Sequence, residues 1–430
     1  YNIAIGSSAG GSLSTGTANT IMGGLAGDAL TTGVQNVIIG AAAGDALTEG
    51  SNNIAIGFNA LGNADTDARN VAIGTRALED QDAGNNTYNV AIGYEAGKQI
   101  TTGVQNTILG AAAGDALTTG ADNVAIGYAA MTTDDAGGRS VALGSFALRM
   151  QNGGSLHVYN VGIGYNAGAS MTNGTLNTII GGNAGDALTT GSSNIAIGYN
   201  ALSTEDTGQA NIAIGQGALQ NANYDGTAYN VAVGHEAGND ITTGKNNTLI
   251  GGLAGDALTT GDNNVAVGRS ALSAETGGGR NIAIGYQTLK DLNTDSQGYN
   301  IAIGYNAGVD MTSGTRNTLI GSLTGDALTS GYYNTALGYQ ALSASVSGRN
   351  AVAIGYQALS NENSTNTETY NVAVGYTAGS QISTGVQNTL IGGLAGDALT
   401  TGGSNVVLGY QALTTEQAGG RNVAIGTFAL

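Results

Sequence analysis

The sequence of 430 residues contains no cysteine, no proline and no tryptophan. Without cysteine, the chain can form neither a disulfide nor a thiolate metal site. Proline removes a hydrogen-bond donor from a strand ladder, so its absence is typical of a chain whose strands are paired throughout. There is also no apolar run of about 18 residues, the length that a membrane-spanning helix needs. This excludes a transmembrane helix, and we expect no membrane insertion.

Basic residues are scarce, because 12 lysines and arginines stand against 30 aspartates and glutamates, giving a net charge of −18. An acidic surface repels nucleic acid and anionic membranes, so neither is expected as a partner. Only two histidines occur, His157 and His235, and no Gly-rich phrase ends in the Lys-Ser or Lys-Thr of a phosphate-binding loop. The sequence therefore predicts that the protein is not an enzyme.

One phrase, Asn-Val-Ala-Ile-Gly with close variants, recurs along the whole chain and opens at Asn2, Asn19, Asn36, Asn53 and so on. The period of about 17 residues indicates a stack of coils, each of which cannot bury its apolar face alone. We expect an all-β parallel β-solenoid of about 25 coils. No change of composition interrupts the repeat, so residues 1–430 are expected to form one continuous domain, a fragment of a longer fibre.

The coil at residues 230–246 illustrates the repeat, with Asn230 as position 1. Positions 2 and 4 are mostly Val, Ile or Leu around an Ala at position 3, and this alternation predicts a strand. Gly at position 5 and Gly at position 15 predict two corners, with a second short strand at positions 8–12 between them. A corner that needs a positive φ or close backbone approach explains an invariant glycine. The structural corner glycines include Gly6, Gly57, Gly93, Gly164, Gly234, Gly304 and Gly375.

Asparagine at position 1 predicts a ladder of side-chain hydrogen bonds along the stack. The ladder includes Asn89, Asn106, Asn123, Asn230 and Asn247, whereas Ser140 and Ala351 interrupt it. Each coil offers few apolar side chains, so burial against other chains would help to offset the cost of ordering it. The small alanine face suggests that three copies approach a common axis. We therefore expect a homotrimer or filament.

Coils of four types follow one another in a fixed order, which adds a superperiod of roughly 70 residues to the short repeat. The first type starts at Asn89, the second at Asn106, the third at Asn123, and the fourth is longer and carries an inserted segment. The inserted segments are residues 79–87, 149–158, 220–228, 290–298 and 360–369, each followed by a tyrosine: Tyr88, Tyr159, Tyr229, Tyr299 or Tyr370. Insertions in solenoids form loops on one face, often the binding face. These tyrosines are candidate surface contacts, and tolerated loop drift is the alternative interpretation.

The phrase Gly-Asp-Ala-Leu-Thr recurs in the second-type coils and raises the question of calcium. Its aspartates are Asp28, Asp45, Asp115, Asp186, Asp256, Asp326 and Asp397. Stacked aspartates bind calcium in nonapeptide β-rolls, but those rolls need ligands on neighbouring coils. Here the aspartate recurs on every fourth coil after the first cycle. An Asx turn that holds corner amides is the stronger interpretation, so we expect no cofactor and keep calcium as the weaker alternative.

Tyrosine also recurs at position 6, as in Tyr128, Tyr199, Tyr286 and Tyr410. Such a column could stack on sugars or could form an aromatic ladder that shields a corner of the solenoid. His235 stands at the same position and replaces a surface aromatic. These residues leave a glycan or protein on a host cell as a possible partner.

The phrase Val-Ala-Ile-Gly-x-x-Ala, at residues 70–77 and 422–429, resembles the head repeats of trimeric autotransporter adhesins. The longer coil with its Thr-Thr-Gly linkers is similar to repetitive tail-fibre proteins of phages. The resemblance implies a homotrimeric β-roll on a virion or in the extracellular space. It implies a fibre shaft that presents a receptor-binding tip, or a surface adhesin whose lateral surface mediates attachment. The adhesin coils are shorter than the coils of this chain.

Overall fold

A computed structural model describes residues 1–154, 157–365 and 367–430. Ser155, Leu156 and Asn366, which belong to the second and fifth inserted segments, lie outside the described residues. The chain divides into two compact units, Tyr1–Ala213 with Asn223–Thr227, and Ile214–Ala222 with Ala228–Leu430. Each unit is built from the same coil.

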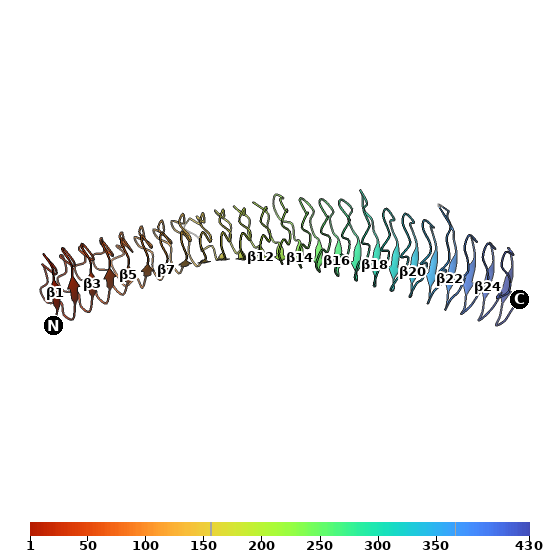
Figure 1. Cartoon of the computed structure of the whole chain (residues 1–430), viewed down its shortest axis with the longest axis horizontal. Coiled ribbons are helices and arrows are strands. Elements are labelled where there is room, and N and C mark those ends of the chain that lie inside the picture. Colours follow the sequence, from red (N-terminus) through yellow and green to blue (C-terminus); the bar gives the residue numbers. More distant parts are fainter. Residues whose placement is uncertain (155–156, 366) are drawn as a thin grey trace. The chain divides into compact units, whose positions relative to one another are not determined.

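Each coil contributes one strand of three residues, and 25 such strands occur in the described part of the chain (Figure 1). The strands are β1 (Ile3–Ile5), β2 (Thr20–Met22), β3 (Val37–Ile39), β4 (Ile54–Ile56), β5 (Val71–Ile73), β6 (Val90–Ile92), β7 (Thr107–Leu109), β8 (Val124–Ile126), β9 (Val141–Leu143), β10 (Val161–Ile163), β11 (Thr178–Ile180), β12 (Ile195–Ile197), β13 (Ile212–Ile214), β14 (Val231–Val233), β15 (Thr248–Ile250), β16 (Val265–Val267), β17 (Ile282–Ile284), β18 (Ile301–Ile303), β19 (Thr318–Ile320), β20 (Thr335–Leu337), β21 (Val352–Ile354), β22 (Val372–Val374), β23 (Thr389–Ile391), β24 (Val406–Leu408) and β25 (Val423–Ile425). The protein is thus the expected all-β parallel β-solenoid, with about 17 residues per turn.

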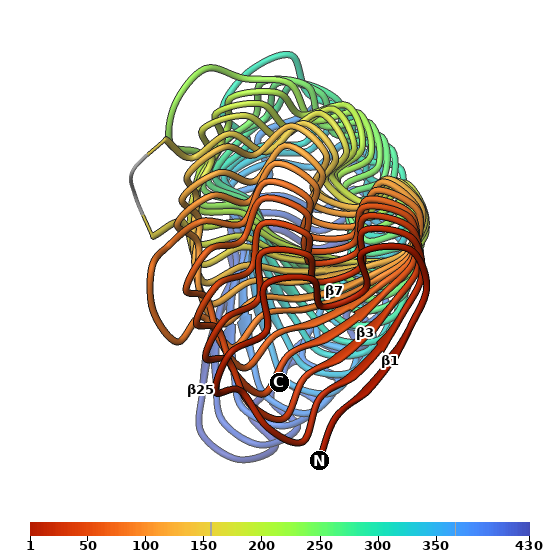
Figure 2. The same ribbon diagram turned by 90° about the vertical axis from the view of Figure 1, so that its left-hand side faces the viewer.

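Within each unit, successive strands pair in parallel and without any slip of register. Thr248 of β15 pairs with Val265 of β16, and the next two residues of each strand follow in step. Within each unit, the coils lie one behind another in the end-on view of Figure 2. Because equivalent positions stack, a side chain that occurs at one position in every coil becomes a continuous row.

The middle side chain of each strand points into the coil, and the two outer ones point outwards. In β14, Ala232 is fully buried, whereas Val231 and Val233 are half-buried. The expectation that the alanine face packs on neighbouring chains is therefore wrong, because this face lines the interior of the coil. Position 3 also holds the larger Ile or Leu of the second-type coils, as at Ile108 and Leu249, and these side chains are likewise buried. The apolar face open to other molecules is the β-branched one.

The second strand expected at positions 8–12 does not form, and this segment is a series of turns. In the coil that starts at Asn194, Asn200 at position 7 has φ +55° and Leu202 at position 9 has φ +52°. Alternating left-handed residues bend the backbone and are incompatible with an extended strand. Hydrogen bonds between coils continue nonetheless: the Gly185 N–H, at position 9 of its own coil, donates to Ala201 O at 2.9 Å.

Large and small residues alternate between coil types inside the solenoid. A methyl group on Gly238 would lie 2.7 Å from Leu249 Cδ1 and 3.1 Å from Leu219 Cδ2, which belong to the two neighbouring coils. A glycine at position 9 of one coil therefore makes room for leucines of the coils before and after it. Close packing of this kind explains why the coils come in a fixed order of types.

The predicted corner glycines share one geometry. Gly6, Gly57, Gly93, Gly164, Gly234, Gly304 and Gly375 have φ between +133° and +145°. A methyl group on any of them would lie 2.4–2.5 Å from the main chain of the corner glycine in the next coil. Both the backbone conformation and the close approach therefore require glycine. The glycines at position 15 lack a positive φ. In the first- and second-type coils their Cβ would also meet the next coil; for Gly103 the nearest atom is Gly120 O at 2.4 Å, whereas for Gly137 it is Asp134 Oδ2 of its own coil.

The position-1 asparagines bond along the stack and across the coil. The Asn106 main-chain N–H donates to Asn89 Oδ1 at 2.9 Å, and Asn106 Nδ2 donates to Gly120 O at 2.9 Å. Asn123, Asn230 and Asn247 repeat the contact across the coil: their Nδ2 atoms donate to Gly137 O, Gly244 O and Gly261 O at 2.8–2.9 Å. Each buried amide therefore ties one strand to the opposite corner and to the next coil.

Replacing Asn264 with alanine is expected to destabilise the surrounding coils. Asn264 Oδ1 accepts from the Asn281 N–H at 3.0 Å, and its Nδ2 donates to Gly278 O at 3.0 Å. The variant leaves two buried main-chain groups without partners, each costing roughly 1–3 kcal/mol. Native-state hydrogen exchange measures the local free energy of opening. Asn293→Ala, at an exposed asparagine of the neighbouring inserted loop, is the control and should change it little; equal effects of the two variants would contradict this role.

Candidate functional site

The first inserted segment, residues 79–87, forms a loop that projects beyond the coils around it (Figure 2, orange). Each loop leaves its coil near position 12, where the other coil types bury Leu, Ile or Met. At this position most third- and fourth-type coils place a polar side chain instead, as at Asp134 and Glu205, whereas Ala64, Ala222 and Leu292 keep it apolar. The loops are the part of the chain in which the repeats differ most, so the way they are attached to the solenoid matters for any surface function.

A fully buried carboxyl group lies at the base of each loop. These groups are Asp67, Asp134, Glu205, Glu275 and Glu362. Glu275 accepts from the Thr294 N–H at 3.1 Å and from Thr294 Oγ1 at 3.0 Å, and Asp67 accepts from the Ala83 N–H at 2.9 Å. Asp134 accepts from Gln151 Nε2 at 2.7 Å. The carboxyl groups therefore hold the first residues of the loops against the coil.

Burial raises the pKa of all five carboxyl groups. Desolvation is the largest cause in each case, and hydrogen bonds to the carboxylate oppose it. Glu205 Oε2 has no hydrogen-bond partner, although Glu205 Oε1 accepts from the Gly208 N–H at 2.7 Å. Sequence reasoning missed these residues. The available signal was an acidic side chain at a position that is apolar in sister coils, as for Glu205 compared with Leu188.

The tyrosines that close the loops lie on the surface. Tyr88, Tyr159, Tyr229, Tyr299 and Tyr370 are 43–63% exposed, and their φ values are +49° to +54°. Three of them receive an arginine from the preceding third-type coil. The guanidinium carbons of Arg69, Arg139 and Arg280 lie 5.3–5.7 Å from the ring centroids of Tyr88, Tyr159 and Tyr299, and each arginine also donates to the hydroxyl. The recurring arginine at the end of third-type coils was the missed signal.

The other two loop-closing tyrosines have different surroundings. Ala210 stands where Arg139 stands in the preceding cycle, on the coil before Tyr229. The Tyr370 hydroxyl donates to Glu368 Oε2 at 2.6 Å. The arginine–tyrosine pair is thus a feature of three cycles, and any recognition by this surface would differ from loop to loop.

The aspartates of the Gly-Asp-Ala-Leu-Thr phrases lie apart from other ligands. No group of three or more acidic or histidine side chains suited to a metal ion occurs among residues 1–154, 157–365 and 367–430. Asp115 illustrates the environment: its Oδ1 is buried without a hydrogen-bond partner, and burial is the main cause that raises its pKa. In the first cycle, Asp28 and Asp45 stand on consecutive coils, and the charge of Asp28 adds to the raised pKa of Asp45, for which burial is the larger cause.

Five of the position-6 tyrosines form two stacked groups. The rings of Tyr339, Tyr356 and Tyr376 follow one another at centroid distances of 5.5 and 5.2 Å with interplanar angles of 17° and 9°. Tyr286 and Tyr305 stack in the same way at 5.6 Å. The groups end at second-type coils, where position 6 is glycine, alanine or serine: Gly24, Ala41, Ala111, Gly182, Gly252, Ser322 and Gly393.

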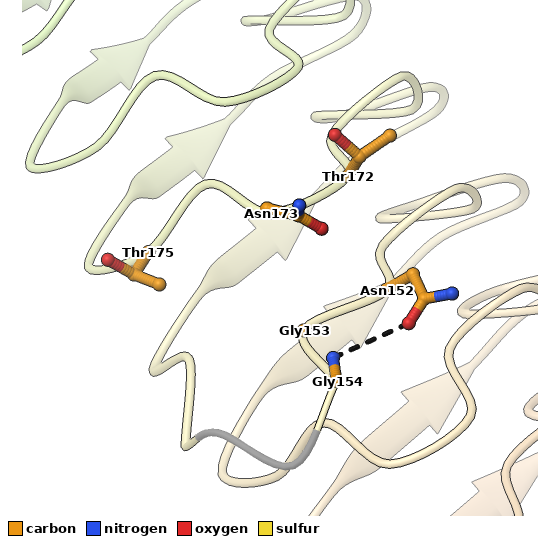
Figure 3. A pocket seen from close by; sticks show the side chains of 6 residues that line it. All are labelled: Asn152, Gly153, Gly154, Thr172, Asn173 and Thr175. Atoms are coloured by element: carbon orange, nitrogen blue, oxygen red, sulfur yellow. Dashed lines mark hydrogen bonds between the residues drawn. The ribbon is translucent and has the colours of Figure 1, made fainter.

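An open hollow of about 500 Å³ lies beside the second inserted loop (Figure 3). Asn152, Gly153 and Gly154 line one side, and Thr172, Asn173 and Thr175 of the next coil line the other. The Gly154 N–H donates to Asn152 Oδ1 at 3.4 Å. The lining side chains are uncharged asparagines and threonines, which can form hydrogen bonds with a ligand.

Comparison with models of protein families and with curated protein sequences finds no match to this chain. The established property of the chain is its fold, a repetitive parallel β-solenoid. In the part of the chain that the structure describes, no helix is long and apolar enough to cross a bilayer.

Proposed function

We propose that the chain is the structural shaft of an extracellular or virion fibre, in which homotrimers space or present a receptor-binding tip. The observation that carries this proposal is the outward face of the strands. Position 2 is Val, Ile or Thr and position 4 is Val, Ile, Leu or Met in every one of the 25 described strands. No charge interrupts either row, although the protein carries a net charge of −18.

Such an apolar face is expected to be buried against another molecule. Ile250, Leu337 and Leu408 remain 40–45% exposed on it, and extended apolar patches on soluble proteins mark interaction surfaces. On this face, similar apolar residues recur at the spacing of the strands. A second copy of the chain has the same spacing and therefore matches the face best. Copies can then associate in register along each unit. This supports self-association through the β-branched face in place of the alanine face.

The mechanical role follows from the bonding. Within each unit, neighbouring coils are joined by main-chain hydrogen bonds and, except at Ser140 and Ala351, by the buried asparagine row, so separating two coils breaks many bonds at once. Apart from the strands at the ends, few main-chain N–H groups of the strands are free to pair with other chains. This limits aggregation through strand edges. These properties suit a shaft that must remain stiff outside a cell.

The mass of the full chain in solution tests the proposal. Light scattering should give three times the 42.3 kDa chain mass. Replacing outward Ile282 and Ile284 of β17 with glutamate should weaken the assembly while leaving the coil intact, because neither side chain enters the interior. Thr243→Glu with Thr260→Glu, at exposed positions outside the strands, adds the same charge and should leave the mass unchanged. A stable monomer for the unaltered chain would rule out the trimer.

A bacterial surface adhesin or extracellular filament is the second candidate. The projecting loops and the exposed arginine–tyrosine pairs favour it, because they place varied chemistry on the lateral surface. The sequence of the full-length gene separates the two functions: an anchor barrel favours the adhesin, and a tip or chaperone domain favours the fibre.

A further inference from the structure

Two exposed tyrosines flank most second-type coils at position 6, and the coil between them has almost no side chain there. We call each such arrangement a clamp. The clamps are Tyr94 and Tyr128 around Ala111, Tyr165 and Tyr199 around Gly182, Tyr305 and Tyr339 around Ser322, and Tyr376 and Tyr410 around Gly393. We propose that these clamps bind neutral glycans by inserting a sugar ring between the two tyrosines.

The small residue leaves an open place between the two rings. A methyl group built on Gly182 would meet only the ring of Tyr199, whose Cδ2 lies 3.5 Å away. Gly393 repeats this arrangement, with Tyr410 Cδ2 at 3.4 Å and nothing else within 4 Å except Cε2 of the same ring. One tyrosine ring therefore borders the space between the two tyrosines of the clamp, and this space is open towards the other tyrosine.

The dimensions of the repeat match one inserted ring. Coils are about 4.8 Å apart, so the two clamp tyrosines are roughly 10 Å apart along the stack. A ring midway between them lies about 5 Å from each, within the contact range of stacked rings. The chain itself shows that such a ring fits: Tyr356 occupies the equivalent place between Tyr339 and Tyr376, at 5.5 and 5.2 Å.

Exposure differs among the tyrosines. Tyr165 and Tyr199 are 57% and 56% exposed, whereas Tyr356, which is stacked on both faces, and Tyr339, which is stacked on one, are both 43% exposed. An aromatic ladder that only shields the backbone has no reason to leave regular gaps with uncovered ring faces. The uncovered faces instead provide flat apolar walls of the kind found in ligand sites.

Polar side chains stand next to the rings at position 7. Asn166 and Asn183 accompany the Gly182 clamp and are joined by a hydrogen bond of 3.3 Å. Beside two other clamps, Asn306 Oδ1 and Thr377 Oγ1 have no hydrogen-bond partner. Rotation of these half-buried side chains can offer the groups to a ligand without breaking an existing bond. Apolar walls with hydroxyl-binding groups at the edge match a pyranose, which has apolar ring faces and a rim of hydroxyls.

The charge of the protein selects among ligands with flat rings. A net charge of −18 repels nucleic acid and acidic sugars, so a neutral glycan is favoured. Within the second unit, the Ser322 and Gly393 clamps are four coils apart, about 19 Å at the strand spacing. Weak single sites on one chain then gain affinity for a polymer or a cell surface by acting together. The inference rests on the proposed function only in that an extracellular chain meets such glycans.

The third cycle supplies an internal control. His235 and Arg269 replace the two tyrosines around Gly252. Gly182→Tyr, Gly393→Tyr, Ala111→Tyr and Ser322→Tyr together fill the four clamps with a ring like Tyr356, while every native tyrosine is kept. Gly252→Tyr adds a ring where no clamp exists. All five positions lack a positive φ, so the coil should accept the new side chains.

Binding is measured on immobilised oligosaccharides that end in glucose, galactose, mannose or N-acetylglucosamine, with sialylated and sulfated glycans and a proline-rich peptide for comparison. We expect the unaltered chain to retain neutral glycans, the filled variant to lose at least tenfold in affinity, and Gly252→Tyr to match the unaltered chain. Circular dichroism and solution mass check that the variants fold and assemble. The inference is overturned if no neutral glycan is retained, if the peptide or charged glycans bind better, or if the filled variant binds normally. Because mass reports assembly separately, failure here leaves the fibre proposal standing.

Discussion

Replacing Gly251 with alanine is expected to open the coils around β15 and β16, with a loss of roughly 3–5 kcal/mol in local stability. Gly251 has φ +133°, and a methyl group on it would lie 2.6 Å from Gly268 O and 2.7 Å from Gly268 C. The left-handed backbone costs an alanine about 1–3 kcal/mol, and the overlap with main-chain atoms adds a similar amount. The next coil cannot move away, because it is held by the same hydrogen bonds along the stack.

Native-state hydrogen exchange is the measurement, because stability in a repeat protein is local and a global melt would average it over the whole stack. Amides of β15 and β16 should exchange more than a hundredfold faster. Gly252→Ala is the matched control: it lies one residue later, has no positive φ, and its nearest atom, His235 O, is 3.9 Å from the new methyl group. Protection that falls equally in both variants would show that the corner does not need glycine.

Raising the pH from 5 to 8 is expected to destabilise the solenoid at the bases of the inserted loops. Burial raises the pKa of Glu205 above its ordinary value of 4.5. Below the pKa of the unfolded chain, both states hold the proton and stability is complete. Between that pKa and the higher folded one, the folded state holds more protons, so each rise in pH favours unfolding. The loss begins near pH 4.5 and ends above the folded pKa.

Glu205→Gln tests this with the shape of the side chain unchanged. The variant removes the charge from Oε2, which lacks a partner, and keeps an oxygen for the Gly208 N–H. We expect it to be more stable than the unaltered chain by about 1–2 kcal/mol at pH 8 and nearly equal at pH 5. Asp225→Asn removes the same charge from an exposed carboxylate in the adjoining loop and should leave the pH dependence unchanged. Lower stability of Glu205→Gln at pH 8 would contradict the prediction.

The solenoid could be predicted because its cause is local. Alternation at positions 2–4, glycine at position 5 and a fixed period specify one short strand, one corner and a stack. The candidate site was harder to predict from the sequence. Arg139 and Tyr159 are 20 residues apart, and their contact depends on two coils of different length being stacked in register. The buried acids at the bases of the loops look like surface residues in the sequence, since a solvated acidic side chain is the usual case.

By itself, the sequence determined the coil, its strand and the rows of identical residues, since each follows from the preferences of a few adjacent residues repeated along the chain. The tertiary structure decided which face of the strand is inside. Alternation separates Ala232 from Val231 and Val233 but does not say which side the chain will close behind. The left-handed turns at positions 7 and 9 bring the chain back over Ala232, so the β-branched face is left outside. That outcome moved the proposed interface between copies from the alanines to the β-branched rows. It also left the tyrosine clamps at the corner where the strand ends.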